Sequence, residues 1–433
     1  MKVSKYFSAI SLSEDTWLLY AALNDAFVVV SKNVLPNVKE PVLLQASGKL
    51  REDLISAGII VERVCDEVAI LEERIMDIDN CNKLLQLTVN PTINCNFSCW
   101  YCYEHHAKNT KMSPETCDAV VKYLNNYLER NVDTEEFTLS FFGGEPLIYF
   151  RDVVMPLIKE CEVVCCTHGV CFNVHFTTNG YLLSDECVAF LSNYNSSFQI
   201  TLDGSESFHD KIRFPKPGVG SYSRIMHNIM RAAKAACRVI VRLNYTSENI
   251  DSLDSVINDL NNFPIEIKKY IQVDFQRVWQ DITPEGLDSV TDKIAKYFRR
   301  TISSGITATS HYAFDLVRAS CYGDKKEYML VNYNGELYKC TARDFANTPC
   351  LGKLASDGSV EWDQEICDIR LNVKLSKAIC RECRIAPLCG GGCRQKAMEC
   401  IEKQECIYNY SEQAKDQIIL DRFEFRYLAN KVK

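Results

Sequence analysis

The chain has 433 residues, of which 24% are charged, and its formal net charge is −8 at pH 7. This length suggests roughly two to four domains. An acidic balance without a long basic run argues against nucleic acid or an anionic membrane as a main partner. The chain starts without the apolar stretch of a secretory signal, and no apolar run reaches the roughly 18 residues of a membrane helix, so we expect a cytoplasmic protein.

The first 80 residues are expected to form a small α+β domain. Apolar runs at 17–20 and 26–31 predict a β-hairpin, residues 49–57 a helix and residues 58–61 a short strand. A different pattern begins at residue 84, and cysteine spacings replace it near residue 320. We therefore place the domains at 1–80, 81–310 and 311–433.

In the second domain, strands are expected to alternate with helices, which predicts a parallel sheet, either open or closed as a barrel. The Ser113-Pro114 and Thr283-Pro284 pairs each place a capping residue before proline at a helix start. Ligands of such folds lie at the carboxyl ends of the strands. The expected strands are 84–89, 137–142, 171–177, 198–202, 239–245 and 271–276, and the expected helices are 114–128, 153–164, 185–192, 222–236, 250–261 and, in the third domain, 411–428.

The chain contains 22 cysteines, which in a reducing compartment indicate bound metal rather than disulfides. Cys95, Cys99 and Cys102 directly follow the first strand of the expected sheet. Three thiolates can hold three irons of a [4Fe–4S] cluster and leave the fourth iron open to a ligand. The alternative is structural zinc, which needs a fourth ligand such as His105 or His106. The spacing favours the iron cluster.

Residues 95–103, CNFSCWYCY, resemble the signature of radical S-adenosylmethionine (SAM) enzymes. The resemblance implies a partial (β/α)6 barrel of the TIM type. It also implies a [4Fe–4S] cluster whose open iron binds SAM. An electron from that cluster would cleave SAM to a 5′-deoxyadenosyl radical, which abstracts hydrogen from the substrate.

Three strand ends resemble further motifs of this family. By that resemblance Glu145 binds the ammonium group of SAM, while glycine lets the backbone approach a ligand closely. Asn179 and Asp203 have a simpler alternative as turn residues before glycine. The implied SAM-binding residues are Gly143, Gly144, Glu145, Asn179 and Asp203. Weaker candidates are Asn244, Gln276 and Arg213, although a surface position is the default for Arg213.

A second set of cysteines resembles the SPASM domain, which carries two auxiliary iron–sulfur clusters, expected here as [4Fe–4S]. Zinc bound in a treble-clef or ribbon module is the rival interpretation. The resemblance implies one cluster held by Cys380, Cys383, Cys389 and Cys406, and another held by Cys321, Cys340 and Cys393. The fourth ligand of the latter is left open between Asp315, His311 and substrate, and Cys400 is an alternative to Cys406. A separate group, expected as free thiols in a helix-to-strand connection, comprises Cys161, Cys165, Cys166 and Cys171.

Many peptide-modifying members of this family begin with a small domain that binds the leader of a precursor peptide as an added strand. Anaerobic sulfatase-maturating enzymes instead place the three-cysteine motif close to the N-terminus, whereas 94 residues precede Cys95 here. The first domain is therefore expected to bind a leader, with a plain structural extension as the alternative.

The sequence thus predicts a radical SAM/SPASM maturase, an oxidoreductase that oxidises or crosslinks a ribosomally made peptide or protein. Ferredoxin or flavodoxin would supply the electrons. The alternative is an enzyme of the sulfatase-maturating type that forms formylglycine. A non-catalytic zinc-binding scaffold or regulator is an alternative of another class, and the Gly143-Gly144-Glu145 segment argues against it. No residue identifies a catalytic base, the peptide or the bond formed.

Overall fold

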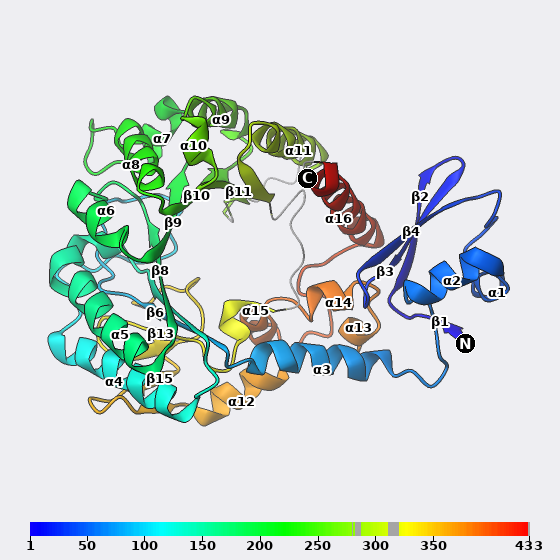
Figure 1. Cartoon of the computed structure of the whole chain (residues 1–433), viewed down its shortest axis with the longest axis horizontal. Coiled ribbons are helices and arrows are strands. Elements are labelled where there is room, and N and C mark those ends of the chain that lie inside the picture. Colours follow the sequence, from blue (N-terminus) through cyan, green and yellow to red (C-terminus); the bar gives the residue numbers. More distant parts are fainter. Residues whose placement is uncertain (279, 282–286, 311–319, 432–433) are drawn as a thin grey trace. The chain divides into compact units, whose positions relative to one another are not determined.

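The computed structural model describes residues 1–278, 280–281, 287–310 and 320–431, and the described residues fall into two compact units (Figure 1). The barrel unit comprises residues 82–310 and 327–364, apart from the gaps. The terminal unit combines residues 1–81 with 320–326 and 365–431. The three domains inferred from the sequence stay a prediction. Most described residues of the first and of the last of them belong to the same compact unit.

The barrel unit is built on one sheet in the order β12-β11-β10-β9-β8-β7-β6-β13-β14-β15-β16. Strands from β12 to β13 in this order run parallel, and the last three pair antiparallel. Register brings apolar residues side by side: Leu87 faces Leu139, which faces Val174. The strands are β6 (Leu84–Val89), β7 (Glu136–Phe141), β8 (Cys171–Thr178), β9 (Asn195–Leu202), β10 (Arg238–Tyr245), β11 (Ile271–Arg277), β12 (Thr307–Ser310), β13 (Met329–Val331), β14 (Glu336–Tyr338), β15 (Gly352–Leu354) and β16 (Val360–Trp362).

Helices cover the outer side of the parallel strands, as α4, α5, α6 and α8 show in Figure 1. The Ser113 hydroxyl accepts a hydrogen bond from the Thr116 N–H and so caps α4, directly before proline. Gly169, with φ +68°, ends α5 in the left-handed conformation. The helices are α4 (Pro114–Arg130), α5 (Met155–His168), α6 (Asp185–Leu191), α7 (Glu206–Ile212), α8 (Tyr222–Lys234), α9 (Leu253–Asn261), α10 (Ile265–Lys268) and α11 (Leu287–Ser303), with short turns η1 (Pro146–Tyr149), η2 (Phe150–Val154) and η3 (Ile250–Ser252).

The terminal unit contains a three-stranded antiparallel sheet, in the order β2-β3-β4, that is covered on both faces. Tyr6, Leu18 and Tyr20 pack on one side with residues of the C-terminal segment, including Ile419. The other face packs against the first two helices. The strands are β1 (Lys2–Val3), β2 (Phe7–Ser13), β3 (Thr16–Ala21), β4 (Ala26–Ser31) and β5 (Ile60–Val61), and the helices are α1 (Glu40–Leu44), α2 (Gly48–Ser56), α3 (Glu67–Asn80), η4 (Tyr322–Asp324), α12 (Gln364–Asn372), α13 (Ala378–Arg381), α14 (Ala386–Cys389), α15 (Arg394–Glu399) and α16 (Glu412–Lys431).

The predicted α/β class, with a partial barrel, a small N-terminal domain and a cysteine-rich C-terminal region, is confirmed. All six expected strands of the sheet are present. The sequence missed β12 and β13, which extend the parallel sheet at both ends, as well as β2 and α3. The expected cap at Thr283-Pro284 lies outside the described residues.

Candidate radical SAM site

The three cysteines of the signature lie on the long loop between β6 and α4. Cys95 and Cys99 are half-buried and Cys102 is exposed. Burial raises the pKa of all three thiols, that of Cys102 to about 11, and the nearby Arg213 guanidinium lowers each of them. The cation thus favours the thiolate form that binds iron. His106, a candidate zinc ligand, places Nε2 3.4 Å from the Cys102 sulfur.

Two glycines let the loop after β7 press against the cysteine loop. Gly143 and Gly144 have φ values of +76° and +47°. A Cβ at Gly144 would lie 2.1 Å from the backbone oxygen of Asn94, and one at Gly143 would lie 2.5 Å from the Asn90 side chain. The Gly144 N–H also donates to Glu104 Oε2 at 2.8 Å. Both positions therefore need glycine for this close approach.

Glu145 joins the loops that follow β7 and β8. Its side chain is completely buried. Oε1 accepts hydrogen bonds from the Leu147 N–H at 3.0 Å and the Thr178 hydroxyl at 2.7 Å, and Oε2 accepts one from the Asn179 N–H at 2.8 Å. Binding of the SAM ammonium by Glu145 stays a prediction. What the structure shows is a carboxylate that fixes two neighbouring loops.

Asn179 links the end of β8 to the cysteine loop. Its Nδ2 donates to Asn96 Oδ1 at 2.8 Å and to the Cys95 sulfur at 3.9 Å. Its Oδ1 accepts from the Tyr181 N–H at 3.0 Å, the bond of a local turn. Asn179 is therefore both a turn residue and a direct neighbour of a predicted iron ligand.

Tyr101, within the signature, receives side chains from the ends of three strands. Its hydroxyl donates to Asp203 Oδ2 at 2.6 Å and accepts from Arg213 Nη1 at 2.7 Å and Asn244 Nδ2 at 3.3 Å. Gln280 donates to the Tyr101 carbonyl at 2.8 Å. The cysteine loop is thus tied to Asp203 after β9, to Asn244 near the end of β10 and to Gln280 after β11. Arg213, whose default from the sequence is the surface, is instead 8% exposed.

His209, which the sequence analysis missed, contacts the backbone of Asp203. The Asp203 N–H donates to His209 Nδ1 at 3.2 Å, so the imidazole proton is on Nε2, which donates to the Ser221 hydroxyl at 3.0 Å. The hydroxyl in turn donates to the Arg213 carbonyl at 2.6 Å. Burial, together with the charge of Arg213, holds the pKa of His209 well below its usual value. A neutral histidine therefore positions Asp203 and Arg213.

Several polar atoms at this edge of the sheet are buried and lack a hydrogen-bond partner within the described residues. Such atoms are costly to bury unless a ligand or water satisfies them, which fits a polar ligand here. These atoms are Asn90 Oδ1, Asn96 Nδ2, Glu104 Oε1, Asp203 Oδ1 and Arg213 Nε. Of the weaker candidates, Asn244 joins the Tyr101 contacts, whereas Gln276 Nε2 donates to Asp274 on its own strand at 3.0 Å.

Comparison with known proteins agrees with this geometry. The sequence model of the Radical SAM superfamily matches residues 89–260, the stretch that carries the cysteine loop, the glycine loop and Asp203. Residues 89–260 belong to the radical SAM superfamily. The cysteine-type anaerobic sulfatase-maturating enzyme of Clostridium novyi is 22% identical over 350 residues, which cover 72% of this chain and 88% of that enzyme.

Two solved structures share the fold of this chain. Native anSMEcpe with bound AdoMet has a TM-score of 0.61 at 18% identity, and the match covers 81% of this chain and 100% of that one. SuiB of Streptococcus suis bound to the precursor peptide SuiA has a TM-score of 0.53 at 14% identity, with coverage of 96% and 100%. The described relatives include SPASM-type maturases.

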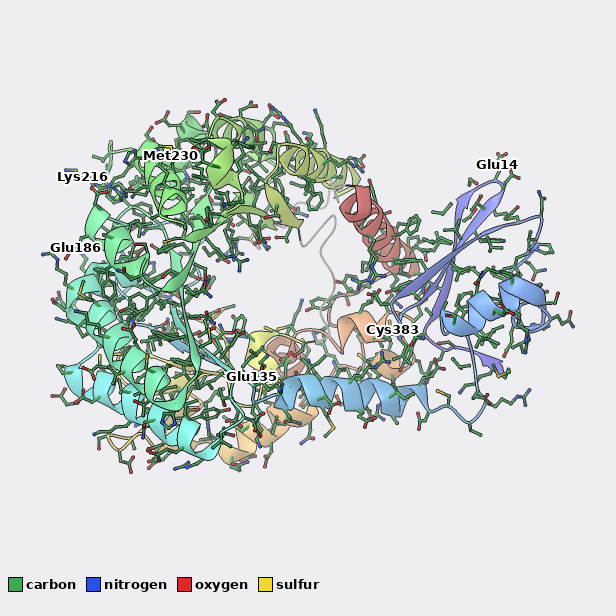
Figure 2. All side chains as sticks on the ribbon, in the orientation of Figure 1. Glu14, Glu135, Glu186, Lys216, Met230 and Cys383 are labelled. Atoms are coloured by element: carbon green, nitrogen blue, oxygen red, sulfur yellow. The ribbon has the colours of Figure 1, made fainter. Side chains whose placement is uncertain are left out.

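In the terminal unit, the four cysteines predicted to share one auxiliary cluster interact with each other. Burial, together with the thiols of Cys383, Cys380 and Cys406, raises the pKa of Cys389 to about 12. Burial also raises the pKa of Cys380, with additional effects of Cys406 and Cys383. Cys383, on the turn between α13 and α14, is labelled in Figure 2. These mutual effects on pKa indicate that the four thiols are neighbours. Their assignment to one iron–sulfur cluster stays a prediction, as does the choice of Cys406 over Cys400.

The second predicted auxiliary set is divided between the units. Cys321 and Cys393 lie in the terminal unit and are exposed, whereas Cys340 lies in the barrel unit and is half-buried. The Cys393 N–H donates to the Tyr408 hydroxyl at 2.9 Å. His311 and Asp315, candidates for a fourth ligand, lie outside the described residues. These ligand assignments stay predictions.

The remaining cysteines correct one local expectation. Cys161, Cys165 and Cys166 lie within α5, and Cys171 begins β8, so they do not form a connection between elements. The helix α5 continues through Cys161, Cys165 and Cys166 because the left-handed glycine that ends it is Gly169. Across the residues with described positions, no three or more His, Cys, Asp or Glu side chains are already arranged to hold a metal ion. None of the described helices combines the length and apolar character needed to cross a membrane.

Proposed function

We propose that this chain is a radical SAM/SPASM maturase that oxidises or crosslinks a ribosomally made peptide or protein. The observation that carries the proposal is the convergence on the cysteine loop of Asn179, Asp203 and Asn244 from three successive strand ends. Among the residues joined by these bonds, Asn96 Nδ2, Asp203 Oδ1 and Arg213 Nε are buried and have no partner within the described residues. A polar ligand beside a three-cysteine loop is what a SAM-cleaving site requires.

The donor set fits a [4Fe–4S] cluster with one open iron, because the loop supplies three thiols in the field of Arg213. When bound, that cluster supplies the electron that cleaves SAM to a 5′-deoxyadenosyl radical, with a ferredoxin or flavodoxin as electron source. The chain itself shapes the site. Gly143 and Gly144 keep side chains out of the loop contact, and Glu145 fixes the loops around it.

The first test is the iron and sulfide content of anaerobically reconstituted protein, measured beside a Cys95→Ala/Cys99→Ala/Cys102→Ala variant. Three four-iron clusters predict about twelve irons in the parent and about eight in the variant. SAM cleavage should disappear in the variant. Zinc in place of iron, or no loss of iron in the variant, would refute the radical mechanism.

The peptide is proposed to bind by its leader along β4. This strand ends the sheet β2-β3-β4 and pairs only with β3 among the described strands. The Lys32 N–H donates to the Asp15 carbonyl at 2.8 Å, and the register of β3 and β4 continues from this pair. The backbone groups of even-numbered residues of β4 therefore bond to β3, and those of odd-numbered residues point away from β3. Phe27, Val29 and Ser31 therefore offer their N–H and C=O groups to an added strand.

Val29 provides a selective test because it is 54% exposed and its N–H points outward. Proline at this position removes one donor from the free edge and leaves the β3 pairing intact, whereas Val29→Ala keeps the donor. We expect Val29→Pro to abolish binding of peptides selected on the full chain from a random-sequence library and Val29→Ala to retain it. Equal binding by both variants would exclude the β4 edge.

The sulfatase-maturating alternative has support of its own. The Clostridium novyi relative is named as a cysteine-type enzyme of that class. This alternative predicts formylglycine in a Cys- or Ser-containing sulfatase peptide, with the same yield in Val29→Pro as in the parent. The full extent of anSMEcpe is matched by 81% of this chain, while SuiB matches 96%. The additional length favours the leader-dependent enzyme.

A further inference from the structure

The terminal unit contains a buried group of four charged side chains, here called the charge cluster: Asp79, Asp324, Lys374 and Arg394. Their side chains are 3–7% exposed. Lys374 Nζ lies 2.7 Å from Asp324 Oδ2 and 3.7 Å from Asp79 Oδ2, and Arg394 Nη2 donates to Asp79 Oδ2 at 2.8 Å. Charges so deeply buried are retained only when each has a partner of opposite sign.

The charge cluster holds two predicted iron ligands in place. Asp324 Oδ2 accepts the Cys321 N–H at 3.0 Å, which closes the turn η4. Arg394, the residue after Cys393, donates through Nη1 to the Asp324 carbonyl at 2.6 Å. The backbone of one cysteine and the neighbour of the other are thus bonded to the same aspartate.

A second arginine joins the same two elements. Arg370, on α12, donates to the Gly323 carbonyl of η4 at 2.8 Å and to Gln395 Oε1 on α15 at 2.8 Å. The turn that follows Cys321 and the helix that follows Cys393 are therefore linked twice. Both links use charged donors, which make stronger hydrogen bonds than neutral groups do.

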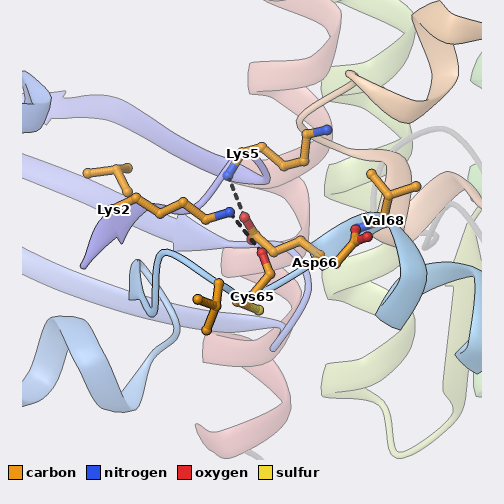
Figure 3. Close-up of a pocket in the computed structure, with 8 residues that line it drawn as sticks. Lys2, Lys5, Cys65, Asp66 and Val68 are labelled. Atoms are coloured by element: carbon orange, nitrogen blue, oxygen red, sulfur yellow. Dashed lines mark hydrogen bonds between the residues drawn. The ribbon is translucent and has the colours of Figure 1, made fainter.

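Asp79 connects the charge cluster to the first 80 residues. It lies in the last turn of α3, where the helix dipole disfavours a negative charge. Its position is explained by its contacts: besides the cations, the Ser320 hydroxyl donates to Oδ1. At the other end of α3, Glu67 accepts hydrogen bonds from the Ser4 hydroxyl and from the Lys5 N–H, beside a cavity of about 310 Å³ (Figure 3). The helix α3 thus runs between two buried carboxylates.

We propose that the charge cluster positions Cys321 and Cys393 for their auxiliary iron–sulfur cluster and that its charge sets the reduction potential of that cluster. The proposal rests on the proposed function, which provides the auxiliary clusters. Reduction adds one negative charge to an iron–sulfur cluster, and nearby charge shifts its potential. Loss of an acid at Asp79 leaves one more positive charge in a poorly solvated region, which stabilises the reduced state. Asp79 and Lys374 are accordingly positioning residues.

The test is a redox titration, followed by electron paramagnetic resonance, of the reconstituted full chain. We expect Asp79→Asn to raise the midpoint potential of one auxiliary cluster and Lys374→Gln to lower it. The double variant restores the parent's total charge and should return the potential toward that of the parent. The matched control is Asp77→Asn, because Asp77 is exposed on the same helix. It removes the same charge and should shift nothing.

The outcomes separate this proposal from the proposed function. A parent with only about four irons per chain would refute the auxiliary clusters themselves. About twelve irons, with equal potentials in the parent, Asp79→Asn and Lys374→Gln, would overturn the proposal for the charge cluster alone. If Asp79→Asn does not fold, the double variant should be recovered folded because it restores the charge balance. A double variant that is also unfolded would overturn the proposal.

Discussion

Replacing Gly144 by alanine is expected to displace the cysteine loop itself. The added Cβ would lie 2.1 Å from the Asn94 oxygen and 2.6 Å from the Asn94 carbonyl carbon, both backbone atoms next to Cys95. An ordinary contact of about 3.5 Å then requires a movement of about 1.4 Å. Overpacking of this kind costs about 1–3 kcal/mol. The left-handed φ of +47° adds about 1–2 kcal/mol for a residue with a Cβ. We therefore expect Gly144→Ala to lower the free energy of unfolding by about 2–5 kcal/mol.

Gly169→Ala provides the matched control for this prediction. Gly169 also has a left-handed φ, +68°, but its Cβ would meet nothing within 4 Å. Backbone strain alone should lower the free energy of unfolding of the Gly169→Ala variant by about 1–2 kcal/mol. This variant should keep its full iron content. Unfolding by urea measures the first quantity, and iron content after anaerobic reconstitution measures the second, where Gly144→Ala should lose about four irons. If Gly144→Ala matched Gly169→Ala in both, the close approach of the two loops would not matter for cluster binding.

Two further predictions concern buried groups of the barrel unit. Tyr101→Phe removes the hydroxyl that bonds Asp203 and Arg213. We expect urea unfolding to show a free energy of unfolding lower by about 2–4 kcal/mol, and calorimetry to show weaker SAM binding. Unchanged values would contradict the role of this hydroxyl. Burial lowers the pKa of His175 from 6.5 to about 4. Because the unfolded chain then binds the proton more readily, stability is lost as pH falls from 6.5 toward 4, by at most about 3 kcal/mol. His175→Asn should flatten the difference between urea unfolding at pH 7 and pH 5, and an equal slope in both proteins would refute the assignment.

The barrel was largely predictable because its strands repeat one pattern along the chain. In β8, β9 and β10 buried residues alternate with half-buried ones, and parallel strands require helices between them. The segments after β6, β7, β8 and β9 were then placed at one edge by topology alone. Short-range spacing was sufficient for this edge because its residues lie within a few positions of a strand end.

The contacts that organise this edge were not predictable. Tyr101 meets Asn244 across 143 positions of sequence. His209 bonds to Asp203 and to Ser221, and none of its described bonds reaches the cysteine loop. Neither residue type signals such a role by itself. For Glu145 the contact with SAM stays a prediction, and the structure adds three donors of the chain around its buried carboxylate, which the sequence did not indicate.

The two predicted iron-binding regions solve the same physical problem in similar ways. Cysteines that receive iron must stay accessible, and Cys102, Cys321 and Cys393 are indeed exposed. Their loops therefore cannot be fixed by apolar packing around the thiols. Buried carboxylates do this instead: Glu145 fixes the two loops that bond to the cysteine loop of the barrel unit, and Asp324 with Asp79 acts in the terminal unit. Each accepts hydrogen bonds from backbone or cationic donors, so the loop keeps its shape before the metal arrives. Such supporting groups orient metal ligands, and their loss weakens metal binding even though they never contact the metal. A substitution at Asp79 should therefore affect iron binding, whereas one at Asp77, on the same helix and exposed, should not.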